Sequence, residues 1–474
     1  MRSKRRKPVG ASAPASDRFD VLLFLVASGL LLSFIWRLQN LFTPWAMIQG
    51  PSLMAGAGLL LLFVSGRHRT VIARARHPVG VATLVILLMV VVSIPWSLYP
   101  GLSFGFLFGD FLKTLLMMAV VLGAIRHGGH LEKVALMTVA GAGLYCLYTL
   151  TNFQLGTSGR LGKLIYYDAN DLAVWLVVTM PLAAHLVFRP PFRFARVVGL
   201  VCLGMILTVF AQTGSRGGFI GLVAVACYMV LGYRQFPLAK RIGVAAALFF
   251  GLSLVASETY WDLMATLLDP TSDYNWTGNE RGGGRMNIWR RGIGYMLGDP
   301  LTGVGARAFP IAEGTFSEFA ARQQFGIGWK WSAAHNSFVQ IGAELGVIGL
   351  AAFTAAIGIA FRRLSRIARR ASDPSVVSMA RALSAALVGY VAAGFFLSQA
   401  YGAYLYLLLG MVIGLDVSLG TGRAPWRNGR RPRSGAAPPR GARRRGVLAP
   451  GPAGAVSPRA PGAAAGTGSV GAVT

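Results

Sequence analysis

The chain has 474 residues, of which 54% are hydrophobic and 13% are charged. Soluble domains typically contain about 25% charged residues, so this composition excludes a soluble fold and predicts a membrane protein. The 46 Lys and Arg residues outnumber the 17 Asp and Glu residues and give a formal charge of +29. In a soluble chain such an excess suggests a nucleic-acid partner. In a membrane chain the positions of the basic residues report orientation instead, and we expect no nucleic-acid partner.

Twelve apolar segments follow one another along the chain, each close to the roughly 20 residues that cross a bilayer as a helix. The first segment leads into a short loop and a second apolar segment, not into a small-residue cleavage site, so we predict a retained helix and no signal peptide. The sequence thus predicts an all-α polytopic membrane protein with about 12 transmembrane helices. The predicted spans are 21–36, 45–65, 79–98, 105–125, 134–153, 169–188, 197–213, 217–233, 242–257, 336–361, 377–397 and 402–417.

The basic residues predict the orientation of these spans. If the N-terminus lies in the cytoplasm, the connections on that side include the Arg-rich segments 67–76 and 362–370. The short outer connections contain only Arg37, Arg160, Lys163 and Arg216. Because cytoplasmic connections carry the excess of Lys and Arg in membrane proteins, this distribution supports cytoplasmic N- and C-termini.

One connection is much longer than the others and divides the chain. The predicted parts are a basic cytoplasmic N-terminus (1–20), transmembrane helices 1–9 (21–257), a large outer loop (258–335), transmembrane helices 10–12 (336–417) and a disordered basic cytoplasmic tail (418–474). The tail is rich in Arg, Pro, Gly and Ala, a composition that favours disorder and contact with anionic membrane lipids. The outer loop has amphipathic stretches at 261–268 and 288–297, and we expect short helices there that lie against the membrane face.

Polar residues at the outer ends of the spans are the candidates for a functional site. The predicted topology brings the following residues to one face: Arg160, Asp168, Asn170, Asp171, Arg216, Glu280, Arg281, Arg285 and His335. Arg216 lies between two apolar segments on the side that positive charges avoid, so a bound anion explains it better than a snorkelling side chain. Arg285 begins a predicted helix, where Arg is not a capping residue, and its position fits an exposed loop charge equally well.

His335 directly precedes a predicted span. A lone His is more often structural, yet the usual pKa of its imidazole suits proton removal near neutral pH. Glu344 lies inside that span, where a carboxylate is costly and is either functional or paired with a neighbouring loop or helix. Gly346 and Gly349 are three residues apart in the same span, and this spacing favours close helix packing.

Motifs that are missing from the sequence limit the reaction. The chain has no Walker loop, no dinucleotide fingerprint, no His-Glu-x-x-His, no cysteine metal cluster and no Asp-x-Asp on the predicted outer face. We therefore expect neither a metal nor a cofactor. A phosphate bound at this face would be held by Arg, because the guanidinium group pairs with phosphate oxygens and stays charged.

Short polar and glycine-containing segments mark the ends of the predicted spans. In chain order they are Arg160-Leu161-Gly162, Asp168-Ala169-Asn170-Asp171-Leu172-Ala173, Gly214-Ser215-Arg216-Gly217-Gly218, Gly284-Arg285 with Trp289, Gly303-Val304-Gly305, His335-Asn336-Ser337 and Glu344-Leu345-Gly346-Val347-Ile348-Gly349. Their order resembles the O-antigen ligase and polymerase superfamily of bacterial membrane glycosyltransferases, over roughly residues 80–415. The chain departs from the family pattern at Ala169, where a proline is more usual.

The resemblance implies a GT-C-like fold and a metal-independent, inverting transfer of a glycan from undecaprenyl diphosphate to an acceptor hydroxyl. The reaction would take place at the periplasmic face of the bacterial cytoplasmic membrane, as in lipopolysaccharide and polysaccharide biosynthesis. By position, the resemblance implies that Arg216, Arg285 and Arg160 bind the diphosphate and that His335 activates the acceptor. We further assign supporting roles to Asn170, Asn336 and Glu344.

Other functions stay open at this point. The acceptor is a glycolipid, a growing glycan or a protein, so a polysaccharide polymerase or a protein O-oligosaccharyltransferase is the alternative among enzymes. A membrane transporter is the alternative of another class, although a transporter would favour polar residues at mid-membrane and repeated halves with broken helices. A flippase or scaffold that holds the lipid diphosphate would need the arginines but not His335.

Overall fold

A computed structural model of the chain contains helices and no β-strand in the part that it describes, apart from an isolated bridge between Leu155 and Leu161. It describes residues 15–37, 44, 47–153, 155–156, 160–162, 167–269, 284–317 and 332–420. The chain divides into two units, Met1–Asn428 and Gly429–Thr474, and all described residues belong to the first. The predicted all-α class is confirmed. The predictions for residues 1–14, for Glu280 and Arg281, and for the tail beyond residue 420 lie outside the described residues.

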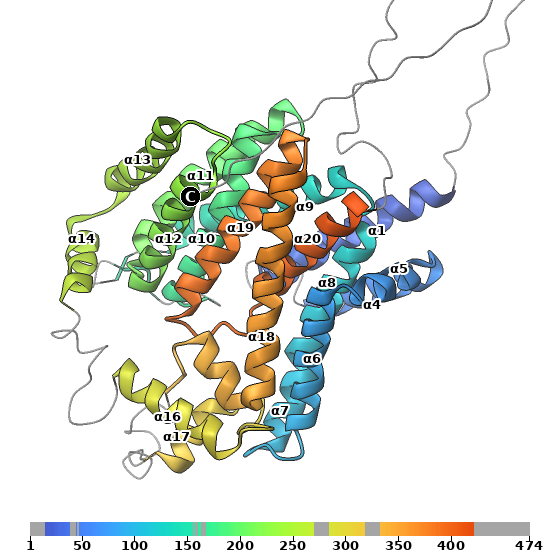
Figure 1. Ribbon diagram of the computed structural model, residues 1–474, viewed down its shortest axis with the longest axis vertical. Helices are drawn as coiled ribbons and strands as arrows, with labels where there is room; N and C mark the ends of the chain where they lie inside the picture. Colours follow the sequence, from blue (N-terminus) through green and yellow to red (C-terminus); the bar gives the residue numbers. More distant parts are fainter. Residues whose placement is uncertain are drawn as a thin grey trace, which may run out of the picture. The chain divides into compact units, whose positions relative to one another are not determined.

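Every predicted span contains a helix (Figure 1). The first part comprises α1 (Ala15–Phe34), α4 (Gly50–Val64), α5 (Arg67–Ala75), α6 (Pro78–Ser93), α7 (Pro100–Phe106), the π-helix η1 (Leu107–Phe111), α8 (Leu112–Ala124) and α9 (Gly128–Asn152). Then follow α10 (Ala169–Phe188), α11 (Arg193–Thr213), α12 (Arg216–Gly232), α13 (Leu238–Val255), α14 (Glu258–Ala265), the 3-10 helix η2 (Thr266–Leu268), α16 (Arg285–Gly298) and α17 (Phe309–Phe316). The last three are α18 (Ser337–Arg370), α19 (Pro374–Gly394) and α20 (Ala403–Gly420).

Eight helices of the described part are long and apolar enough to cross a membrane. The pair α4 and α5 also passes this test but is bent by 98° at its junction, and three shorter apolar helices lie at Phe19–Phe34, Pro78–Ser93 and Arg216–Gly232. These helices indicate an integral membrane protein, while the count of twelve crossings stays a prediction. The two short helices predicted after residue 258 are present as α14 and α16, and α17 was not predicted.

The central helix of the described part is α10. It packs against α9, α11, α12 and α19, and 78% of the residues in its apolar stretch are buried inside the protein. The neighbouring pair α12 and α19 approaches closely because Gly221 has no side chain: a Cβ atom there would lie 2.9 Å from the Cβ atom of Ala393. By contrast, only 6% of the residues of α13 are buried inside the protein. Nearly the whole surface of α13 is therefore available for contact with lipid.

A break at Gly346 divides α18, which packs against α6, α16 and α19. Gly346 has φ 68° and ψ −169°, a conformation that only glycine adopts readily. In an unbroken helix the Val347 N–H would donate to the carbonyl of Ala343. Here it donates to Pro300 O (2.8 Å), and Ala343 O accepts from Val304 N (2.9 Å) instead.

The segment at residues 300–305 therefore replaces part of the hydrogen bonding of α18. Gly303 also has a positive φ of 66°, and a Cβ atom there would lie 2.4 Å from the carbonyl carbon of Glu344. The prediction that the Gly346 spacing reflects close helix packing was wrong. Gly346 is needed for its backbone conformation and for the close approach of Pro300, whose carbonyl oxygen lies 2.4 Å from the Cβ position.

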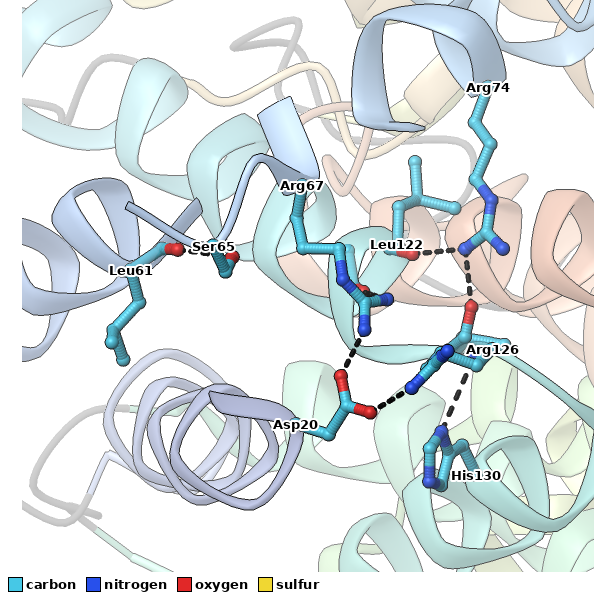
Figure 2. Close-up of polar contacts among 10 residues, drawn as sticks. Asp20, Leu61, Ser65, Arg67, Arg74, Leu122, Arg126 and His130 are labelled. Carbon is cyan, nitrogen blue, oxygen red and sulfur yellow. Dashed lines mark hydrogen bonds and ion pairs between the residues drawn. The ribbon is translucent and has the colours of Figure 1, made fainter. Parts of the chain in front are cut away.

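Arginine side chains join the ends of α1, α5 and α8 (Figure 2). The Asp20 carboxylate forms ion pairs with both Arg67 and Arg126. Arg74 of α5 is buried and donates through Nη1 to the carbonyl oxygens of Leu122 and Ile125, the latter at 2.5 Å, where α8 ends. These contacts satisfy carbonyl groups that have no partner inside α8.

Candidate functional site

The segment Gly214-Ser215-Arg216 forms a tight turn between α11 and α12. Gly214 ends α11 with φ 56°, and Ser215 caps α12 because its Oγ accepts a hydrogen bond from Gly218 N (3.2 Å). Arg216 is the first residue of α12, and its Nη1 donates to Thr266 Oγ1 of η2 (3.0 Å). The guanidinium of Arg216 thus lies where the short turn meets the first part of the long loop.

Arg160 lies beside this turn. Its Nε donates to Thr213 O (3.0 Å) and its Nη2 donates to Asn170 Oδ1 (3.2 Å). A side chain at Gly214 would overlap it, since a Cβ atom there would lie 2.8 Å from Arg160 Cγ. Burial lowers the pKa of Arg160, the charge of Arg216 lowers it further, and Asp168 opposes both effects. Two guanidinium groups are therefore held close together, as a site for an anion requires.

His335 lies directly before α18 in a strained left-handed conformation, with φ 47°. Its N–H donates to Ser398 Oγ (2.8 Å), and the carbonyl of the preceding Ala334 accepts a hydrogen bond from Trp289 Nε1 of α16 (3.0 Å). Both bonds are made by the peptide group between Ala334 and His335, so the α19–α20 connection and α16 together fix the backbone directly before the imidazole.

The surroundings of His335 favour the neutral form of its imidazole. Burial lowers its pKa, the Arg285 guanidinium lowers it further, and the Asp168 carboxylate raises it in part. Arg285 is the first residue of α16, as the sequence predicted for a helix beginning there. A neutral imidazole is the form that accepts a proton, so the surroundings of His335 suit a general base.

Asp168 connects the two halves of the site. It caps α10, since its Oδ1 accepts a hydrogen bond from Asp171 N (2.7 Å). Its charge acts on the pKa of both Arg160 and His335. The structure therefore brings Arg160 close to Arg216 and His335 close to Arg285, and the Asp168 charge acts on both groups.

Asn336 and Glu344 hold the backbone of the site. Asn336 is buried and caps α18, because its Oδ1 accepts from the N–H groups of Phe338 (2.8 Å) and Val339 (3.1 Å). The buried Glu344 carboxylate accepts from the N–H groups of Arg307 (2.9 Å) and Phe309 (3.4 Å). Of the two roles open for Glu344, the structure shows pairing with a loop.

Several residues at the site have no recognisable signal in the sequence. Ser398 lies in the short α19–α20 connection, which carries no motif, and Thr266 lies in the amphipathic stretch of the loop. Ser398 also lines a polar cavity of about 190 Å³, together with Asp171 and Arg307. Only the polar character of Asp171 at the start of a span could have indicated this cavity.

Comparison with known proteins bears on the central part of this arrangement. Residues 200–354 match the O-antigen ligase family. The matched range contains Arg216, Arg285, His335 and Glu344, and the resemblance to the O-antigen ligase superfamily is confirmed. Together with the apolar helices, this match supports a membrane glycan-processing enzyme.

A second similarity is to an uncharacterized protein of Haemophilus influenzae. The two chains are 20% identical over 214 residues, which is 44% of this chain and 53% of the relative. The match thus spans about half the length of that relative.

Proposed function

We propose that the protein is a membrane glycosyltransferase that moves a glycan from undecaprenyl diphosphate to an acceptor hydroxyl. The arrangement that carries this proposal is His335 with Arg285 close to it, and Asp168, whose charge acts on both His335 and the pair of Arg160 and Arg216. A transferase of this kind needs groups that bind a diphosphate and a base that accepts the proton of the attacking hydroxyl. Both kinds of group are present around Asp168.

In the proposed reaction the acceptor oxygen attacks the anomeric carbon while the bond from that carbon to the diphosphate oxygen breaks. The electron pair of that bond leaves with the diphosphate, and the hydroxyl proton passes to His335 Nδ1 or Nε2. Attack opposite the leaving group inverts the configuration at the anomeric carbon. Arg216, Arg160 and Arg285 would stabilise the charge on the leaving diphosphate by several kcal/mol, and the base would contribute about 10² to 10⁴ in rate.

The compartment follows from the same chemistry. Nucleotide sugars are not expected outside the cytoplasmic membrane, so a transferase at the periplasmic face needs a donor that carries its own activation. A lipid diphosphate supplies this activation, and Arg groups neutralise it without a metal. We therefore propose that the protein lies in the bacterial inner membrane, with both termini in the cytoplasm and the site around His335 at the periplasmic end.

Glycan transfer by the purified protein tests this function. The assay combines lipid-diphosphate oligosaccharide from the host with a panel of glycolipid, polysaccharide and protein acceptors, and it measures released undecaprenyl diphosphate and elongated acceptor. We expect His335→Gln and Arg216→Ala to reduce transfer by at least about 10². Arg290→Ala is the matched control, because Arg290 is exposed on α16 next to the site.

The outcomes separate the alternatives. The acceptor that is elongated distinguishes a ligase from a polymerase and from a protein O-oligosaccharyltransferase. If His335→Gln keeps the wild-type rate, His335 is not the base. If the folded wild type elongates no acceptor, the transferase is rejected in favour of a transporter or a lipid-diphosphate scaffold.

A further inference from the structure

The polar cavity beside His335 has no part in the reaction as described so far. It lies among the ends of α1, α8, α10 and α18 and the α19–α20 connection, and its volume is about 190 Å³. Two contacts link it to the site. Ser398, which lines the cavity, accepts the N–H of His335 (2.8 Å). Asp171, which also lines it, donates its N–H to Asp168 Oδ1 (2.7 Å) in the first turn of α10.

The cavity lining contains both acidic and basic side chains. Two carboxylates, Asp110 and Asp171, face the same space as two guanidinium groups, Arg37 and Arg307. A diphosphate would be repelled by the carboxylates, in contrast to the arginine pair around Arg216. Carboxylates accept and guanidinium groups donate hydrogen bonds, so the lining suits a neutral ligand with many hydroxyl groups.

Amide and phenol groups extend this pattern. Gln399 donates through Nε2 to Asp171 Oδ1, and its Oε1 accepts from Tyr404 OH (2.9 Å). These side chains fix one another, so that the Asp171 carboxylate presents its remaining lone pairs in a defined direction. Phe106 forms an apolar part of the wall, and the Arg307 guanidinium lies over its ring at 6.0 Å.

The backbone that presents these groups is irregular at three places. Asp110 lies in the π-helix η1, a rare geometry that is frequent at functional sites. Arg37 and Arg307 have positive φ values of 52° and 67°, which are strained for arginine. At Arg307 the strain is supported by the buried Glu344 carboxylate, which accepts the Arg307 N–H. Strained residues of this kind concentrate at ligand sites.

We propose that this cavity binds the sugar ring that carries the attacking hydroxyl of the acceptor. Asp110 and Asp171 accept hydrogen bonds from its hydroxyl groups, and Arg307 donates to them. The volume is below the roughly 300 Å³ at which drug-sized ligand pockets begin, so the cavity holds one ring and the rest of the acceptor lies outside. This assignment rests on the proposed function, because it takes His335 as the base.

Acceptor dependence of the transfer rate tests the assignment. Asp110→Asn and Arg307→Gln change exposed side chains, and the backbone contact of Arg307 with Glu344 is kept. Each should raise the acceptor KM about tenfold or more, as expected for a lost hydrogen bond to a charged group. The donor KM and the slow release of undecaprenyl diphosphate without acceptor should not change. The matched controls are Asp262→Asn and Arg290→Gln, both exposed and outside the cavity lining.

Equilibrium binding of the radiolabelled oligosaccharide headgroup of the host glycolipid separates this assignment from the proposed function. One outcome is that the wild type binds the headgroup but transfers no glycan, and that Asp110→Asn no longer binds the headgroup. The transferase would then be rejected, and the cavity would remain a sugar site. Unchanged acceptor KM and unchanged headgroup binding in both variants would overturn the cavity assignment. A rise in donor KM alone would also overturn it, because the cavity would then serve the donor glycan.

Discussion

Replacing Gly346 with alanine should destabilise the protein by about 3 kcal/mol. The backbone of Gly346, with φ 68° and ψ −169°, lies in a region that costs other residues about 1 to 3 kcal/mol. The added Cβ atom would also lie 2.4 Å from Pro300 O, so the 300–305 segment must shift. That shift weakens the hydrogen bonds Val347 N to Pro300 O and Val304 N to Ala343 O, at about 1 kcal/mol each.

Gly358→Ala is the matched control for this change. Gly358 lies on the same helix, and a Cβ atom there would meet nothing within 4 Å. Alanine in a regular helix should therefore be neutral or stabilising, by up to about 1 kcal/mol. Thermal unfolding of both variants and the wild type in the same detergent makes the comparison. If Gly346→Ala unfolds at the wild-type temperature, or no lower than Gly358→Ala, the role given to the helix break is incorrect.

Two further predictions concern His335 and the residue that follows it. Transfer should fail at low pH, because protonated His335 cannot accept a proton, and the fall should begin below the ordinary value of 6.5, since burial and Arg285 lower its pKa. Asp168→Asn keeps an acceptor for the cap of α10 but removes the charge that raises the pKa of His335. The acid limb of the plot of kcat/KM against pH should therefore move to lower pH. An acid limb that stays in place or moves to higher pH contradicts the role of His335 as the base. Asn336→Ala removes the acceptor for two N–H groups and should cost about 1 to 2 kcal/mol of stability, whereas Asn336→Asp should retain most of it, as thermal unfolding of the two variants would show.

The helices could be predicted from the sequence because a helix that crosses the bilayer needs about 20 predominantly apolar residues. The starts of α12 at Arg216 and of α16 at Arg285 could also be predicted, because in each case an arginine marks the boundary between a polar or glycine-rich segment and the helix. The side-by-side position of Arg160 and Arg216 was expected from the predicted topology. What carried that expectation was the assignment of both loops to one face.

The contacts that shape the site could not be predicted in the same way. Ser398 contacts His335 across 63 residues, and a hydroxyl in a short connection has no distinguishing pattern. The prediction for Gly346 was wrong for a different reason. Its spacing from Gly349 fits both close helix packing and a helix break, and only the partner at Pro300 decides between them.

The ion pairs of Asp20 restrict how the chain enters the membrane. Because Asp20 contacts both Arg67 and Arg126, these three residues lie on the same side of the bilayer. The chain must then cross an even number of times between Asp20 and Arg67, and again between Arg67 and Arg126. Two crossings by α1 and α4, and two more by α6 and α8, would meet this requirement. If one of these crossings were missing, Arg67 or Arg126 would lie on the opposite side of the membrane from Asp20 and could not pair with it. The two ion pairs of Asp20 therefore stabilise the correct insertion of each pair of helices separately.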